Sequence, residues 1–204
     1  KGRSLFRTNN ELSNEILKSG RGSPKLGAVI QKGRWRGMPI YSLTLEERAT
    51  CPATCRHWRS CYGNHMPFAK RQPHGPFLEF ALGEELDILS ARHKQGFVVR
   101  LHALGDFYDR AYVDFWHDMM ATFTNLRVFG YTARDPKKPI GKALLQLAER
   151  FPDRWKIRFS YGPIGSFRTG DDGIICPAQT GKTHSCASCS LCWSTDKPIR
   201  FLEY

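Results

Sequence analysis

The sequence lacks the features that place a protein in or across a membrane. It has no apolar run long enough to span a bilayer, and its first residues do not form a signal-peptide pattern. It also has no internal repeat and no low-complexity linker. These absences predict a soluble, cytoplasmic protein without a membrane partner.

Acidic residues are few in relation to basic ones. The 204 residues include 31 Lys+Arg and 19 Asp+Glu, which gives a net charge of +12. Such an excess favours a polyanionic partner, nucleic acid first, although many basic proteins bind none. The length suits one domain with its own core. We expect a basic N-terminal arm over residues 1–37 and a single α/β metal-binding domain over residues 38–204.

Four of the seven cysteines lie in one short segment near the end of the sequence, and Pro177 follows the first of them. They are Cys176, Cys186, Cys189 and Cys192. The last three recur every third residue, as in the ligand sets of ferredoxin-like [4Fe–4S] clusters, here in reversed order. Zinc sites usually pair two separated Cys-x-x-Cys knuckles. The segment therefore predicts a metal centre, with iron–sulfur favoured over zinc, and an odd cysteine count argues against a disulfide scaffold.

Expected strands alternate with amphipathic helices along the chain. Strands are expected at 38–43, 97–102, 126–131, 155–160 and 199–202, and helices at 77–93, 109–123 and 139–151, after a short N-terminal helix at 11–18 capped by Asn9 or Asn10. Residues 161–173 are glycine-rich and are expected to form a loop. Alternating elements are typical of βαβ units. The sequence predicts an α/β fold with a parallel-sheet partial (β/α) barrel and cysteine-rich metal-binding loops.

Ligands of parallel sheets bind at the carboxyl ends of the strands, so residues that follow these ends should share one rim. They are Cys51, Cys55 and Cys61, then His102 and Asp106, then Thr132 and Arg134, then Ser160 and Tyr161. We expect the three cysteines to bind metal rather than to pack as apolar side chains. His102 and Asp106 are candidates for catalytic acid and base, or for orienting a ligand. The alternatives are a hydrogen-bonded histidine and an aspartate that organises the turn.

Two basic stretches contain tryptophan, which is typical of single-stranded nucleic-acid binding. The candidates are Arg34, Trp35 and Arg36 in the arm, and Arg56, Trp58, Arg59, Lys70 and Arg71 near the first cysteines. The alternatives are that Trp35 anchors the arm on the domain and that the second stretch is a solvated basic loop.

The three-cysteine loop, its following Tyr62 and the Gly105-Asp106 pair resemble radical S-adenosylmethionine enzymes. The resemblance implies a [4Fe–4S] cluster on Cys51, Cys55 and Cys61, a cofactor-binding role for Gly105 and Asp106, and an auxiliary cluster at the later cysteines. The spacing here is Cys-x3-Cys-x5-Cys, whereas that family has Cys-x3-Cys-x2-Cys. The Cys-rich ending and the Gly-Asp-Phe segment are also similar to short uncharacterised phage and plasmid proteins.

Together these patterns predict an iron–sulfur protein that binds or acts on nucleic acid, with one or two [4Fe–4S] clusters and with zinc as the alternative metal. The resemblance to radical S-adenosylmethionine enzymes implies S-adenosylmethionine as a further cofactor. A reductase is a further candidate partner. A zinc-stabilised nucleic-acid-binding module without catalysis and a small redox or electron-transfer protein are the alternatives.

Overall fold

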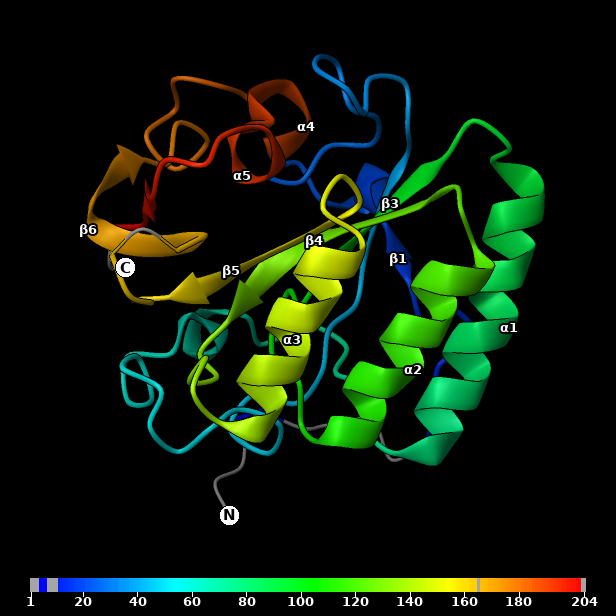
Figure 1. Ribbon diagram of the computed structural model, residues 1–204, viewed down its shortest axis with the longest axis horizontal. Helices are drawn as coiled ribbons and strands as arrows, with labels where there is room; N and C mark the ends of the chain where they lie inside the picture. The colour runs from blue at the N-terminus through cyan, green and yellow to red at the C-terminus, as the bar shows by residue number, and fades with distance from the viewer. Residues whose placement is uncertain (1–3, 7–10, 165, 203–204) are drawn as a thin grey trace.

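A seven-stranded open sheet forms the centre of the molecule (Figure 1). The computed structural model describes residues 4–6, 11–164 and 166–202. The strands lie in the order β1 to β7, and all neighbours from β2 to β7 are parallel, whereas β1 is antiparallel to β2. Because β1 and β7 form the two edges, the sheet does not close into a barrel.

The regular elements have the following bounds. The strands are β1 (Lys18–Ser19), β2 (Ile40–Ser42), β3 (Phe97–Leu101), β4 (Leu126–Thr132), β5 (Trp155–Ser160), β6 (Arg168–Ile175) and β7 (Ile199–Arg200). The helices are α1 (Pro76–Arg92), α2 (Arg110–Thr122), α3 (Pro139–Arg150), α4 (Cys186–Cys189) and α5 (Leu191–Ser194), and two 3-10 turns span Gly20–Gly22 and Tyr62–His65.

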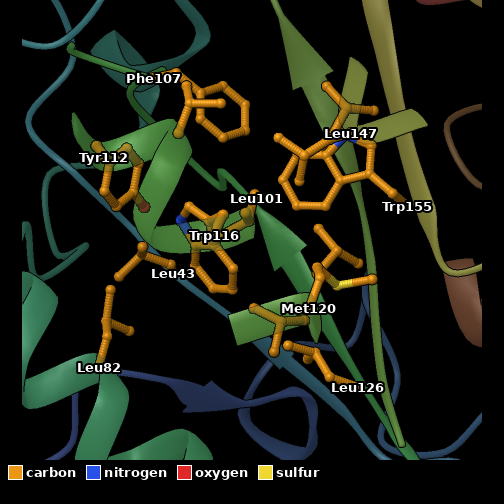
Figure 2. Packing of buried hydrophobic residues seen from close by; sticks show 14 of the residues in the cluster. Leu43, Leu82, Leu101, Phe107, Tyr112, Trp116, Met120, Leu126, Leu147 and Trp155 are labelled. Carbon is orange, nitrogen blue, oxygen red and sulfur yellow. The ribbon is translucent and has the colours of Figure 1, made fainter. Parts of the chain in front are cut away.

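Helices α1, α2 and α3 lie side by side over one face of the sheet (Figure 1). Their apolar stripes form the larger core, in which Trp116 of α2 packs near Leu101, Leu147 and Trp155 (Figure 2). The local sequence sets where two of them begin. The Asp109 carboxylate accepts from the backbone N–H of Tyr112 at the start of α2, and a proline opens α3.

The opposite face is covered by two segments from the ends of the chain. Residues 25–38 and the α4–α5 segment form a second core with Val98 and Phe129 of the sheet. Backbone hydrogen bonds join them directly, from Cys186 N–H to the Lys25 carbonyl at 2.8 Å and from Ala187 N–H to the Leu26 carbonyl at 3.0 Å. A sheet covered on both faces explains why β3 and β4 are nearly continuous apolar runs.

Most expected elements are confirmed, with small shifts at their ends. The five expected strands and the three long helices are present. The expected helix at 11–18 is wrong, because the backbone N–H groups of Ile16 and Leu17 donate to the Glu85 carboxylate of α1 and hold this segment in a non-helical conformation. Its proposed caps, Asn9 and Asn10, lie outside the described residues.

Two strands have little apolar signal of their own. β1 pairs with β2 through only two residues, and β6 occupies part of the segment that was expected to be a glycine-rich loop. In β6 the sequence is RTGDDGII, so backbone pairing with β5 and β7 defines the strand. Across the described ranges, no helix is long and apolar enough to cross a bilayer.

Candidate metal centre

A cavity of about 300 Å³ opens where the carboxyl ends of the central strands meet the two cysteine-rich segments. Its lining includes Arg100 and His102 at the end of β3, Tyr131 of β4 and Ser160 of β5. Six of the seven cysteines also line it, namely Cys51, Cys55, Cys61, Cys176, Cys186 and Cys192. Of the residues expected on one rim, six line the cavity, namely Cys51, Cys55, Cys61, His102, Asp106 and Ser160, whereas Thr132, Arg134 and Tyr161 are not among its lining residues. Three of the four late cysteines face the same space.

The first cysteine, Cys51, is positioned by a hydrogen-bonded junction at the residue before it. The Thr50 hydroxyl accepts from the backbone N–H of Asp106 at 3.1 Å, and Arg134 donates to the Thr50 carbonyl at 2.6 Å. Asp106 in turn accepts from the Thr132 hydroxyl at 2.7 Å and from the Ala133 N–H at 2.8 Å. The ends of β3 and β4 therefore fix where the three-cysteine loop begins.

A buried ion pair supports the far end of the same loop. Arg71 is fully buried, and its guanidinium donates to both carboxylate oxygens of Glu47 at 2.7 and 3.1 Å. It also donates to the carbonyls of Gly63, Met66 and Ala69. Burial opposes ionisation of Glu47, but the hydrogen bonds from Arg71 and Ser4 outweigh it and lower the pKa of this carboxyl.

The late cysteines are fixed to the sheet through Arg158 of β5. Its buried guanidinium donates to five backbone carbonyls, those of Arg168, Leu191, Cys192, Thr195 and Lys197. Next to it, the Tyr131 hydroxyl donates to Cys192 Sγ at 2.7 Å. The sheet therefore holds helix α5 through hydrogen bonds to its backbone carbonyls and to the thiol of Cys192.

The thiols within each group are close enough to influence one another electrostatically. Burial, together with the carboxylate of Asp106, raises the pKa of Cys51 to about 12, and burial and the neighbouring Cys186 raise that of Cys192 to about 12. Across the described residues no disulfide forms, and no three Cys, His, Asp or Glu side chains are already arranged at metal-ligand distances. The buried Cys189 borders Cys186 but does not line the cavity.

His102 is buried, with 5% of its surface exposed, and burial lowers its pKa to about 3, so the ring is neutral. Its Nε2 is 3.1 Å from the Tyr112 hydroxyl, whereas its Nδ1 is buried without a hydrogen-bond partner in the part of the chain that is described. The histidine thus has a partner for one ring nitrogen in α2, while the other ring nitrogen stays without one in the described chain.

Asp106 and Gly105 have structural roles in this turn, in addition to lining the cavity. The Asp106 carboxylate accepts hydrogen bonds from the Thr132 hydroxyl and from the backbone N–H groups of Ala133 and Phe107. Burial raises the pKa of this carboxyl. Gly105 has φ of +86°, and a Cβ there would lie 2.6 Å from Leu45 Cβ. These contacts match the turn-organising alternative for Asp106; catalysis with His102 stays a prediction.

The candidate nucleic-acid residues divide into buried and exposed groups. Trp35 is 2% exposed and stacks on Trp193 with ring centroids 5.5 Å apart, so it anchors the N-terminal segment on α5. Arg71 is also enclosed, because its guanidinium forms the buried ion pair with Glu47. Neither offers a surface to nucleic acid, because both are enclosed. Trp58 is half-buried, and the exposed candidates are Arg34, Arg36, Arg56, Arg59 and Lys70.

Sequence reasoning missed Arg100, Tyr131 and Arg158, which surround the late cysteines on the sheet side. Burial alone would lower the pKa of Arg100, but the nearby Cys186, Tyr131 and Tyr62 raise it overall. A usable signal was present: each arginine stands between two apolar residues of an expected strand, in FVVRL and in WKIRFS. Charged residues inside a buried parallel strand need a specific partner.

A model of the family described as Gene product 88 matches residues 3–164. The chain belongs to the Gene product 88 family. No curated protein and no solved structure matches it. This membership supports the expected similarity to phage-type proteins, while the similarity to radical S-adenosylmethionine enzymes stays a prediction. The Gene product 88 match includes the three-cysteine loop, β3, β4 and β5 and ends before the four late cysteines.

The Glu47–Arg71 pair predicts a specific acid sensitivity of this Gene product 88 chain. A carboxyl whose pKa is lowered by folding stabilises the fold above its unfolded value, about 4.5, and this contribution is lost as the pH falls through the folded pKa. Glu47→Gln should cost about 3 kcal/mol or more near neutral pH, because it leaves Arg71 buried without its charge partner. It should also flatten the acid limb of a plot of unfolding free energy against pH, measured by urea denaturation.

The exposed Glu84→Gln on α1 is the matched control and should change neither quantity appreciably. An unchanged acid limb in Glu47→Gln would show that other carboxyls govern acid unfolding.

Proposed function

We propose that this protein is a metal-dependent enzyme whose cofactor, an iron–sulfur cluster, occupies the cysteine-lined cavity. One observation carries the proposal: two cysteine-rich segments more than a hundred residues apart in sequence place six thiols around a single space. Thiolates are the protein ligands that iron–sulfur clusters use. The cavity lies at the carboxyl ends of parallel strands, where α/β enzymes bind their ligands.

The residues present fit such a group in number and chemistry. Cys51, Cys55 and Cys61 would supply one set of three thiolates, and Cys176, Cys186, Cys189 and Cys192 would supply a set of four. Three protein ligands leave a position for an exogenous ligand, whereas four close the site. Because buried thiols hold their protons, metal binding must release protons and draw the thiols together, so binding energy adds to folding stability.

The second candidate is a zinc-stabilised nucleic-acid-binding module without catalysis, and the late segment favours it. Cys189 is buried outside the cavity, and Arg158 and Tyr131 fix the neighbouring backbone and Cys192. A rigidly held segment that carries four cysteines suits a structural metal.

Metal analysis of anaerobically purified protein tests both candidates. We expect iron and sulfide in the native protein, with broad visible absorption that zinc cannot give. Cys51→Ser and Cys192→Ser should each lower the metal content by a whole centre or a large fraction of one, and Cys192→Ser should also lower the melting temperature by several degrees. Ser60→Ala, which also alters the cavity lining but removes no thiol, is the control.

Zinc without iron would favour the second candidate. Native protein that takes up neither metal would refute the proposed centre altogether.

The finer proposal is that the three-cysteine set binds S-adenosylmethionine at its open position. A reduced cluster there would supply the electron that cleaves this cofactor. The chain's own contribution would be to enclose the cofactor beside Gly105 and to keep His102 neutral and aimed into the cavity. The reduced protein should release 5′-deoxyadenosine when given S-adenosylmethionine, and Cys55→Ser should abolish release. Iron-loaded protein that forms none under strong reduction would leave a redox or binding role.

We also propose nucleic acid as the partner. The proposal is based on the net charge of +12 and on two exposed basic residues, Arg59 in the three-cysteine loop and Lys70 after it. Arg56 is exposed as well, over the ring of Tyr161 at 4.1 Å and 3.6 Å from Asp171. Affinity for single-stranded DNA or RNA should fall steeply with salt, with a log–log slope of about one unit or somewhat less per neutralised phosphate. Replacing Arg56 and Arg59 with Ala should reduce this slope by about one to two units.

Arg110→Ala, on α2 beside Asp114, is the control and should leave the slope unchanged. No binding even at low salt would remove nucleic acid as a partner and leave the metal proposal intact.

A further inference from the structure

The charges that line the cavity do not balance. Two carboxyl residues, Glu47 and Asp106, contribute to the described lining, and both are already engaged: Glu47 with Arg71, and Asp106 with Thr132 and the backbone around it. Arg100 also lines the cavity. It has no ion pair among the described residues, and its buried Nε has no hydrogen-bond acceptor there.

Arg100 is half-buried with its Nε enclosed, so a negative partner in the cavity would stabilise its guanidinium. Arginine stays charged under all ordinary conditions, so it cannot relieve burial by losing its proton. Buried charges in folded proteins are paired or bound to a ligand, because removal from water without a partner is costly. Arg158 shows the alternative in this molecule, since its guanidinium is satisfied by five carbonyls of the chain. Arg100 has no equivalent set.

His102 adds a second unsatisfied group to the same space. It follows β3 directly, two residues after Arg100, and its Nδ1 is buried without a partner in the described chain. Both residues line the cavity. One molecule that carries an anionic group and a further polar atom would satisfy Arg100 and His102 together.

The size of the cavity limits that molecule. A volume of about 300 Å³ is at the small end of ligand pockets, and the proposed metal centre would share it. A polymer strand cannot enter, although one terminal or extruded unit could. Leu104 and Phe129 supply apolar walls around the polar groups.

We propose that the cavity binds a small organic anion, whose carboxylate or phosphate group is held by Arg100 and whose body contacts Nδ1 of His102. As a statement about the substrate, this rests on the proposed metal centre, because the anion would be positioned between the two cysteine sets. Arg100 would act in binding and orientation.

Titration calorimetry with two probes tests the proposal on the full-length, anaerobically purified protein. Inorganic phosphate and malonate are titrated at constant ionic strength against chloride. We expect saturable binding of at least one, and the preferred probe distinguishes a phosphate from a carboxylate ligand. Arg100→Gln should weaken binding about tenfold or more. His102→Phe, which keeps a ring but removes Nδ1, should weaken it less. The exposed Arg110→Gln on α2 is the control and should bind normally.

Three results would overturn the proposal: no saturable binding of either probe by the native protein, undiminished binding by Arg100→Gln, or undiminished binding by His102→Phe. Loss of metal from Arg100→Gln in parallel with loss of anion binding would also overturn it, because the negative partner of Arg100 would then be the metal–thiolate centre itself. Native protein without metal that still binds an anion through Arg100 would refute the proposed function and leave the anion site standing.

Discussion

The buried guanidinium of Arg158 is the constraint on which the cysteine-lined space depends. A buried charge is tolerated only where hydrogen bonds replace its hydration, and here five carbonyls on both sides of the late cysteine segment do so. This arrangement ties α5 to the middle of the sheet. It places the Cys192 thiol next to the hydroxyl of Tyr131. Helix α4, which precedes α5, donates backbone hydrogen bonds to the carbonyls of Lys25 and Leu26. The packing of Trp193 on Phe129, with ring centroids 4.6 Å apart, holds the same segment on the sheet.

The cavity lies between two cysteine-rich segments that cover the carboxyl ends of the central strands. The three-cysteine loop is fixed at its start by Thr50 and near its end by Arg71. The late cysteines come from the opposite side, and the ends of β3 and β4 form the floor. Because buried polar contacts of the sheet and its loops fix both cysteine-rich segments, Arg100 and the lining thiols other than that of Cys192 remain available to a cofactor or ligand. This separation of supporting and functional groups is what a preorganised site requires.

Much of the sheet–helix unit could be predicted because its signals are local. The leucines of α1, the aspartate that caps α2 and the proline that opens α3 each act within a few residues, so sequence spacing was enough. The order of parallel strand ends also predicted that Cys51, His102 and Asp106 would meet. The failures have non-local causes. Residues 11–17 are non-helical because Glu85 accepts from the N–H groups of Ile16 and Leu17. β6 is a strand because β5 and β7 pair with it.

The sequence by itself determined the two thiol sets, the excess of basic residues and the alternation of strands and helices, since these depend on residue type and short spacing. Only the tertiary structure decided that both thiol sets face one cavity, because no local rule specifies how residues 51–61 and 176–192 approach one another. It also decided the role of these arginines. Arg71 and Arg158 are enclosed and bind other parts of the chain. Arg56 and Arg59 face solvent, and Arg100 lines the cavity. Arginine side chains have the same chemistry in the sequence, and burial alone separates these roles.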